Sequence, residues 1–106
     1  MWCKFVENIK DNPQIIDHKE KDLTSCKVEY SAELGKRLLY LRAPIKGIAN
    51  ALDTSFLIFK DTTFQVQLYI GDRFVSAYLA KMLDVCLDKS MGDYECHLNI
   101  ELIGAI

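Results

Sequence analysis

Apolar residues recur along the chain at two spacings, and each spacing predicts a different element. Alternation of apolar with polar residues is typical of a strand that buries one face. It occurs over residues 64–70 and, most clearly, over residues 94–102. We therefore predict a strand at each place, with the second strand holding the C-terminal end of the chain in a sheet.

Spacings of three and four residues predict amphipathic helices in two short segments. The first covers residues 2–9, where a strand is the rival interpretation because the segment is short. The second covers residues 44–53. Pro44 suits its first turn, because the missing N–H has no partner there in any case.

Residues 73–90 predict the longest helix. Their apolar residues cover about half of the helical circumference at ~100° per residue, and Asp72 can cap the first turn. A helix that packs on one sheet needs a narrower apolar stripe. Leu83 and Leu87 therefore require a further cover, which is either the N-terminal helix or a partner chain.

Two further segments complete the pattern. Residues 56–59 are apolar at every position, which predicts a central strand covered on both faces. Residues 25–43 fit either a hairpin that turns near Gly35 or a strand followed by a helix capped by Ser31. We favour the hairpin, with residues 33–43 as its return, because glycine inside a helix costs ~1 kcal/mol relative to alanine.

From residue 36 to residue 103 the predicted order is strand, helix, strand, strand, helix, strand. This order resembles the split βαβ arrangement of ferredoxin-like folds, preceded by an N-terminal extension. We therefore predict one α+β domain over residues 1–106, with an N-terminal helix and charged loop in residues 1–24 and the core in residues 25–106. The core is an antiparallel or mixed sheet of about four to five strands with helices packed on one face.

Composition and charge restrict the functional classes. Thirteen basic and fifteen acidic residues give a net charge of −2, which argues against binding to nucleic acid. The N-terminal segment lacks the apolar core of a signal peptide, and no run approaches the ~20 apolar residues that span a membrane. The sequence therefore predicts a single-domain cytoplasmic protein without a membrane segment.

The best candidate for a functional surface is the polar side of the last predicted strand. Alternate residues of a strand share a face, so the polar residues from Glu95 to Glu101 lie together and Cys96 points away from His97. A histidine flanked by carboxylates can act as a general base or bind a metal, although such a row is more often a solvated face. The polar residues of the strand over 64–70 could lie on the same open face. The candidate binding residues are Glu95, His97, Asn99, Glu101, Gln65, Gln67, Tyr69, Leu83 and Leu87.

Other reactive side chains have simpler interpretations. The cysteines contain no CxxC pair and no zinc-type spacing, so we expect reduced thiols, no metal site and no cofactor. Cys86 falls within the apolar arc of the predicted long helix and is assigned to the core. His18 lies in the charged run of residues 17–22 and is assigned to a surface loop. The four cysteines are Cys3, Cys26, Cys86 and Cys96.

We predict a small non-enzymatic protein that acts by binding another protein, such as an inhibitor, an immunity or anti-defence factor, or an accessory subunit. The single domain, the balanced charge and the surplus apolar surface at Leu83 and Leu87 favour this function. One alternative is a homo-oligomer that binds a small ligand at its subunit interface. The other is a small enzyme that uses His97 with Glu95 or Glu101.

Overall fold

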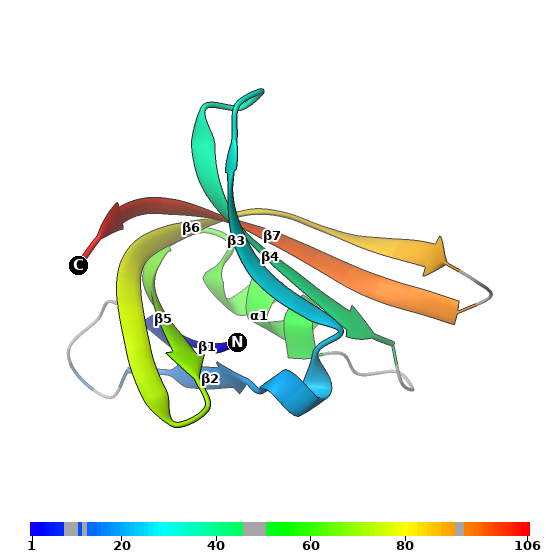
Figure 1. The fold of residues 1–106 in the computed structure, drawn as a ribbon, viewed down its shortest axis with the longest axis horizontal. Coiled ribbons are helices and arrows are strands. Elements are labelled where there is room, and N and C mark those ends of the chain that lie inside the picture. Colours follow the sequence, from blue (N-terminus) through cyan, green and yellow to red (C-terminus); the bar gives the residue numbers. More distant parts are fainter. Residues whose placement is uncertain (8–10, 12, 46–50, 91–92) are drawn as a thin grey trace.

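The described part of the chain contains seven strands, one α-helix and one short 3-10 helix (Figure 1). The structure is a computed structural model and describes residues 1–7, 11, 13–45, 51–90 and 93–106. The elements in chain order are β1 (Trp2–Glu7), β2 (Ile15–His18), the 3-10 helix η1 (Glu20–Asp22), β3 (Ser25–Ser31), β4 (Lys36–Pro44), α1 (Ala51–Phe59), β5 (Thr63–Ile70), β6 (Arg73–Ser90) and β7 (Asp93–Ala105).

All seven strands belong to one sheet in the order β2-β1-β5-β6-β7-β4-β3, and every neighbouring pair is antiparallel. The predicted α+β fold, with several helices on one face of a four- to five-stranded sheet, is therefore wrong. The ferredoxin-like order is wrong as well, because the long predicted helix is a strand in the middle of the sheet.

The largest difference concerns residues 73–90, which form β6 between β5 and β7. The register of β6 against β7 shifts at two places, the second between Met82 and Asp84. An extra residue at a bulge moves the inward side chains by one position. The core-packed side chains are Tyr78, Ala80, Met82 and Val85, which alternate up to Met82 and then step by three at the bulge. Together with the outward Leu79 and Cys86, they give the apolar residues the spacing of a helix face.

A two-residue turn at Gly71 and Asp72 joins β5 to β6. Gly71 has a φ of 59°, a left-handed conformation that glycine adopts without a steric penalty. A Gly-Asp pair between two apolar runs is a recognised hairpin signal. The predicted role of Asp72 as a helix cap is therefore wrong.

The apolar run of residues 56–59 is the second half of α1 and not a central strand. Leu52, Ser55 and Phe59 are its buried residues, at the spacing of one helix face. The helix predicted over residues 44–53 agrees with α1 only over residues 51–53, and residues 46–50 lie outside the described part. Pro44 ends β4 and does not begin a helix.

The N-terminal segment forms the strand β1 and not the predicted helix, so the alternative interpretation of residues 2–9 is the correct one over residues 2–7. Cys3 and Phe5 point into the core, and Trp2 on the opposite face stacks on Tyr69 with ring centroids 4.4 Å apart. The Trp2 indole Nε1 also donates a hydrogen bond of 2.7 Å to the carbonyl oxygen of Gly71. Because both faces of β1 are covered, its apolar residues do not alternate, and the helical spacing is coincidental.

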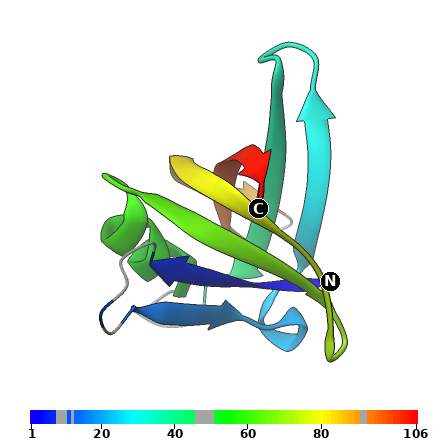
Figure 2. The same cartoon turned by 90° about the vertical axis from the view of Figure 1, so that its left-hand side faces the viewer.

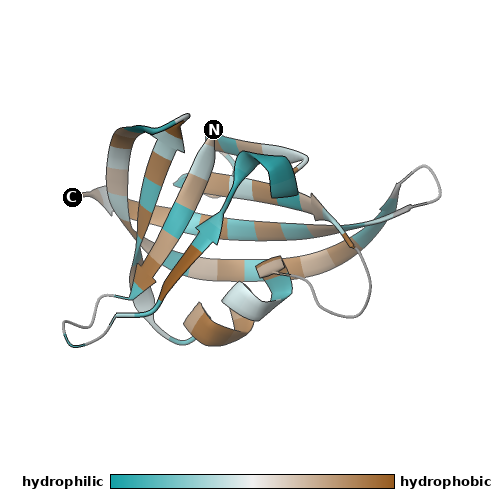
Figure 3. Cartoon of the chain, turned by 90° about the horizontal axis from the view of Figure 1, so that it is seen from below, coloured by the Kyte–Doolittle hydropathy of each residue, from teal (hydrophilic) through white to brown (hydrophobic). Residues whose placement is uncertain are grey.

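The remaining strand predictions are confirmed. Residues 25–43 form the β3–β4 hairpin, and Gly35 in its turn has a φ of 66°. Strands β5 and β7 contain the two segments with regular alternation. The C-terminal end is held by β6, where the backbone N–H of Ile106 donates to the carbonyl of Ala77 at 2.9 Å. Bands of apolar and polar colour alternate along these strands in Figure 3.

The sheet curls so strongly that its two ends, β2 and β3, approach each other at one side of the molecule (Figure 2). Helix η1 lies between them in the chain. The Met1 amino group is 3.8 Å from the Glu20 carboxylate, and the Thr24 N–H donates to the Arg42 carbonyl at 2.8 Å. Helix α1 lies inside the curl, where it contacts β2, β6 and β7.

Three phenylalanines connect α1 with the inner face of the sheet. Phe59 of α1 has its ring centroid 5.9 Å from that of Phe5 in β1 and 4.8 Å from that of Phe64 in β5. All three side chains are fully buried. This cluster is therefore the main apolar contact between the helix and the β1–β5 side of the sheet.

We predict that Phe59→Ala lowers the free energy of unfolding by about 3–5 kcal/mol, because it leaves a cavity in the core. Leu57→Ala is the matched control on the same helix, since Leu57 is 61% exposed. We expect the control to change stability by about 0.5 kcal/mol or less. Urea denaturation measures both, and equal losses for the two variants would contradict this position of α1.

Candidate functional site

The polar residues of β7 lie together on the outer face of the sheet, away from α1. Their neighbours Cys96, Leu98, Ile100 and Leu102 are buried on the inner face. Cys96 accordingly points away from His97. The outer row consists of Glu95, His97, Asn99 and Glu101.

His97 lies between two carboxylates from neighbouring strands. Its Nε2 atom is 2.9 Å from Oε1 of Glu95 and 3.9 Å from Oδ2 of Asp88 on β6. The second carboxylate oxygen of Glu95 accepts a hydrogen bond of 2.6 Å from the Thr24 hydroxyl. This hydrogen bond is the main cause that lowers the pKa of Glu95, and contact with His97 lowers it further. Glu95 is therefore a carboxylate at neutral pH.

A second set of hydrogen bonds crosses three strands at Asn99. The Arg42 guanidinium of β4 donates to Oδ1 of Asn99 at 3.1 Å, and Nδ2 of Asn99 donates to Oδ1 of Asp84 on β6 at 2.7 Å. Glu101 accepts a hydrogen bond of 3.1 Å from Lys36. The charged and polar side chains on the outer face of β4, β7 and β6 therefore hold one another in place through hydrogen bonds.

Gln65, Gln67 and Tyr69 lie on the same face of the sheet but form a separate group, because β6 stands between β5 and β7. The Tyr69 hydroxyl donates to Gln67 at 2.9 Å, and Gln67 donates to Gln65 at 2.6 Å. Trp2 covers the Tyr69 ring, and the Lys19 ammonium lies 3.6 Å from the centroid of the Trp2 ring on β1. The single open face predicted from the sequence is therefore two clusters on different parts of a curved sheet.

Leu83 and Leu87 lie on β6 and not on a helix. Leu83 occupies the position of the second register shift and is half-buried. Leu87, which pairs with buried Cys96, is 64% exposed, and nearby Tyr94 is 56% exposed. Cys86 is also exposed, so its assignment to the core is wrong.

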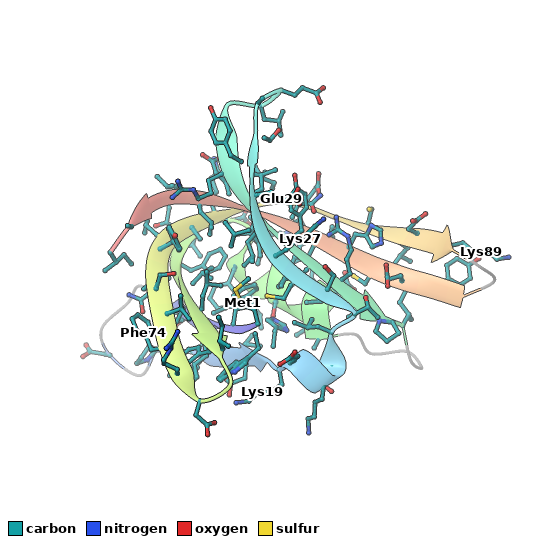
Figure 4. The ribbon with its side chains drawn as sticks, viewed as in Figure 1. Met1, Lys19, Lys27, Glu29, Phe74 and Lys89 are labelled. Atoms are coloured by element: carbon teal, nitrogen blue, oxygen red, sulfur yellow. The ribbon has the colours of Figure 1, made fainter. Side chains whose placement is uncertain are left out.

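Most of the candidate binding residues thus meet on one hairpin, which we call the arm. The arm consists of residues 82–90 of β6 and residues 93–100 of β7. It extends past α1 at one side of the molecule in Figure 1, and Figure 4 shows Lys89 near its end and Phe74 at the opposite side. It carries apolar side chains toward the inside of the curl and the His97 charge pattern on the outside.

Sequence reasoning missed a buried polar pair. His18 is 2% exposed in β2, and its Nε2 atom is 2.8 Å from the hydroxyl oxygen of the fully buried Ser55 in α1. The ring of His18 also contacts the Phe5 ring, with centroids 4.7 Å apart. The assignment of His18 to a surface loop is therefore wrong. The signal for this strand was that Ile16 and His18 occupy alternate positions, with Asp17 between them. The charged residues around them concealed it.

The His18–Ser55 pair resembles half of a hydrolytic triad in composition, but both groups are closed off from solvent. Its role in this structure is to fix α1 to the edge strand β2, because a buried histidine needs a hydrogen-bond partner. Burial lowers the pKa of His18 to about 4, so the ring is neutral at pH 7.

His97 and its two carboxylate neighbours lie on the outer face of the sheet, away from α1. Among the described residues, no group of three His, Cys, Asp or Glu side chains could hold a metal ion. A hollow of about 240 Å³ lies elsewhere, next to the turn of the β3–β4 hairpin, and includes Lys36, Arg37, Tyr78 and Glu101.

Comparison of the chain with known protein families, with curated proteins and with solved structures found no match. No helix in the described ranges is long and apolar enough to cross a membrane. The function must therefore be inferred from the geometry of this chain alone.

The buried histidine predicts a specific loss of stability in acid. The pKa of His18 is about 4 in the folded protein and near 6.5 when unfolded, so only the unfolded chain takes up a proton between these values. Stability should therefore fall by about 3 kcal/mol as the pH drops from 6.5 to 4, and this group has no effect above that window.

Two histidine variants isolate this contribution from the other titrating groups. We expect His18→Gln to remove the histidine part of the pH dependence, and His97→Gln on the outer face to retain it. Urea denaturation at several pH values between 4 and 7 gives the slopes. Identical slopes for the two variants would show that His18 is not the buried titrating group.

Proposed function

We propose that this protein is a non-enzymatic binding module and that the arm is its contact surface for another protein. The observation that carries the proposal is one hairpin that combines exposed apolar side chains with a backbone edge that no described strand pairs with. Neither feature requires a cofactor or a metal.

The backbone edge belongs to the distal half of β6. The pairing of β6 with β5 ends at Lys81, which lies opposite Thr63. Beyond that point, the strand pairings of the described residues join residues 82–90 to β7 alone. A strand with one unpaired side presents N–H and C=O groups that can hydrogen-bond an added strand.

The apolar side chains on the inner face of the arm continue the row of inward side chains of β6 and β7 past the end of α1. Val85 still packs against the core, whereas Leu87 and Tyr94 are exposed beyond it. Exposed apolar residues next to charged ones are a feature of protein contact sites. Partner binding would remove the two exposed side chains from water and so supply hydrophobic free energy.

The charges of the arm indicate the chemistry of the partner. Asp84 and Asp88 are exposed on its outer face, where Asp88 lies opposite Glu95 and Asp84 lies opposite Asn99. Arg42 of β4 and His97 lie next to these carboxylates, and Lys89 lies with Tyr94 on the inner face. Complementary charge favours correct register and excludes wrong partners. We infer that the bound segment is an extended strand whose apolar residues alternate with basic ones.

Affinity capture from the native host with three versions of the chain tests the proposal. Leu87→Asp should abolish capture of a stoichiometric protein partner, because a carboxylate replaces the exposed apolar contact. Leu34→Asp is the matched control, since Leu34 is 55% exposed on the distant β3–β4 turn. The control should capture the partner like the unmodified chain, and circular dichroism checks that both variants fold.

The purified partner then permits a direct affinity measurement. We expect Leu87→Asp to weaken binding by at least about tenfold, as for truncation of a central interface residue. Equal affinity of both variants would place the contact elsewhere. If native mass spectrometry shows only a homodimer, the arm pairs with a second copy and the proposal of a different protein partner is wrong.

A further inference from the structure

Two cysteines face each other across the gap between the ends of the curled sheet. Cys3 lies on β1 with no exposed surface, and Cys26 lies on β3 and is half-buried. Their thiols are within hydrogen-bonding distance, and both side chains pack in the same apolar cluster. The sequence separates them by 23 positions, so no local motif reveals the pair.

The sheet order makes this contact unusual. Strand β1 is second in the sheet and β3 is last, so the whole curl of β5, β6, β7 and β4 lies between them. A further contact across the gap is the ion pair between the Met1 amino group and Glu20. A covalent bond between Cys3 and Cys26 would therefore close the curl and hold its two ends in place.

The two thiols differ in reactivity and in access. Burial raises the pKa of Cys3, whereas the hydrogen bond from the Cys3 thiol lowers the pKa of Cys26. A thiolate is the nucleophilic form of cysteine. A hollow of about 150 Å³, formed in part by Met1, Glu20 and Leu23, reaches Cys26 from the surface. Cys26 is therefore the thiol that meets a small oxidant, and Cys3 is the adjacent thiol that completes the reaction.

We propose that Cys3 and Cys26 form a redox-active pair that a hydroperoxide converts to a disulfide between β1 and β3. In the first step the sulfur of Cys26 attacks hydrogen peroxide, its S–O bond forms, the O–O bond breaks and the thiol proton leaves with the departing oxygen as water. In the second step the sulfur of Cys3 attacks that of Cys26, the S–S bond forms, the S–O bond breaks, and the Cys3 proton leaves with the hydroxyl as a second water. The two thiols lose two electrons in total, and the peroxide gains them.

The other two cysteines provide an internal comparison. Cys86 lies opposite His97 on the outer face of the arm, and Cys96 lies opposite Leu87 on the inner face. Side chains on opposite faces of a sheet cannot form a disulfide without movement of the backbone. Oxidation of the folded chain should therefore join Cys3 to Cys26 and leave Cys86 and Cys96 unlinked.

Peptide mapping of the folded chain after treatment with hydrogen peroxide tests the proposal. Each cysteine falls in a different tryptic peptide, with Cys3 in residues 1–4 and Cys26 in residues 22–27. The expected product is these two peptides joined, with the mass of two hydrogens lost and restored by dithiothreitol. The oxidised chain should also unfold at a temperature higher by roughly 10 °C or more, because the bond restricts the unfolded chain.

A variant separates the two steps. In Cys3→Ser the second thiol is absent, so peroxide should leave a sulfenic acid on Cys26 that reacts with dimedone, while the unmodified chain gives no such adduct. If that variant does not fold, the peptide map of the unmodified chain decides alone. The proposal is overturned if the folded chain keeps all four thiols free, if a different pair is linked, or if the link forms only in denaturant.

Discussion

The structure depends on the burial of one short helix inside a sheet that is long enough to surround it. Helix α1 presents Leu52, Ser55 and Phe59 to the sheet. Phe59 supplies the apolar contact with β1 and β5, and the Ser55–His18 hydrogen bond ties the helix to the edge strand β2. Without the helix, the inner face of a seven-stranded sheet would remain open to water, which is costly for a row of leucines and phenylalanines. The curl and the helix therefore stabilise each other.

This constraint also explains where the candidate site lies. The helix covers the middle of the inner face and contacts both β6 and β7, but the arm continues past it. Leu87 is exposed for that reason, although it belongs to the same inner row as buried Cys96. At the opposite side, the curl brings β1 and β3 together and produces the Cys3–Cys26 contact. Both surfaces of interest are consequences of how far the sheet extends around one helix.

The sequence predicted the strands whose alternation is undisturbed, namely β5, β7 and the β3–β4 hairpin. It also placed Glu95 and His97 on one face of β7. It failed for β6, because the bulge at Leu83 interrupts the alternation of the inward residues and because Leu79 and Cys86 are apolar residues on the outward face. It failed for β1, because Trp2 and Phe5 are buried on opposite faces. The His18–Ser55 and Cys3–Cys26 pairs join residues distant in the chain, so only the tertiary structure brings them together.

The account requires residues 82–90 to form a strand with one free edge, and amide hydrogen exchange of the isolated chain tests this most directly. In a strand paired on one side, amides that face β7 exchange slowly and those that face outward exchange fast, so protection alternates along the segment. The account predicts this alternation in residues 82–90 and continuous protection in residues 78–81, which are paired on both sides. Uniform protection of residues 82–90, as in a buried helix or a strand covered on both edges, would contradict it.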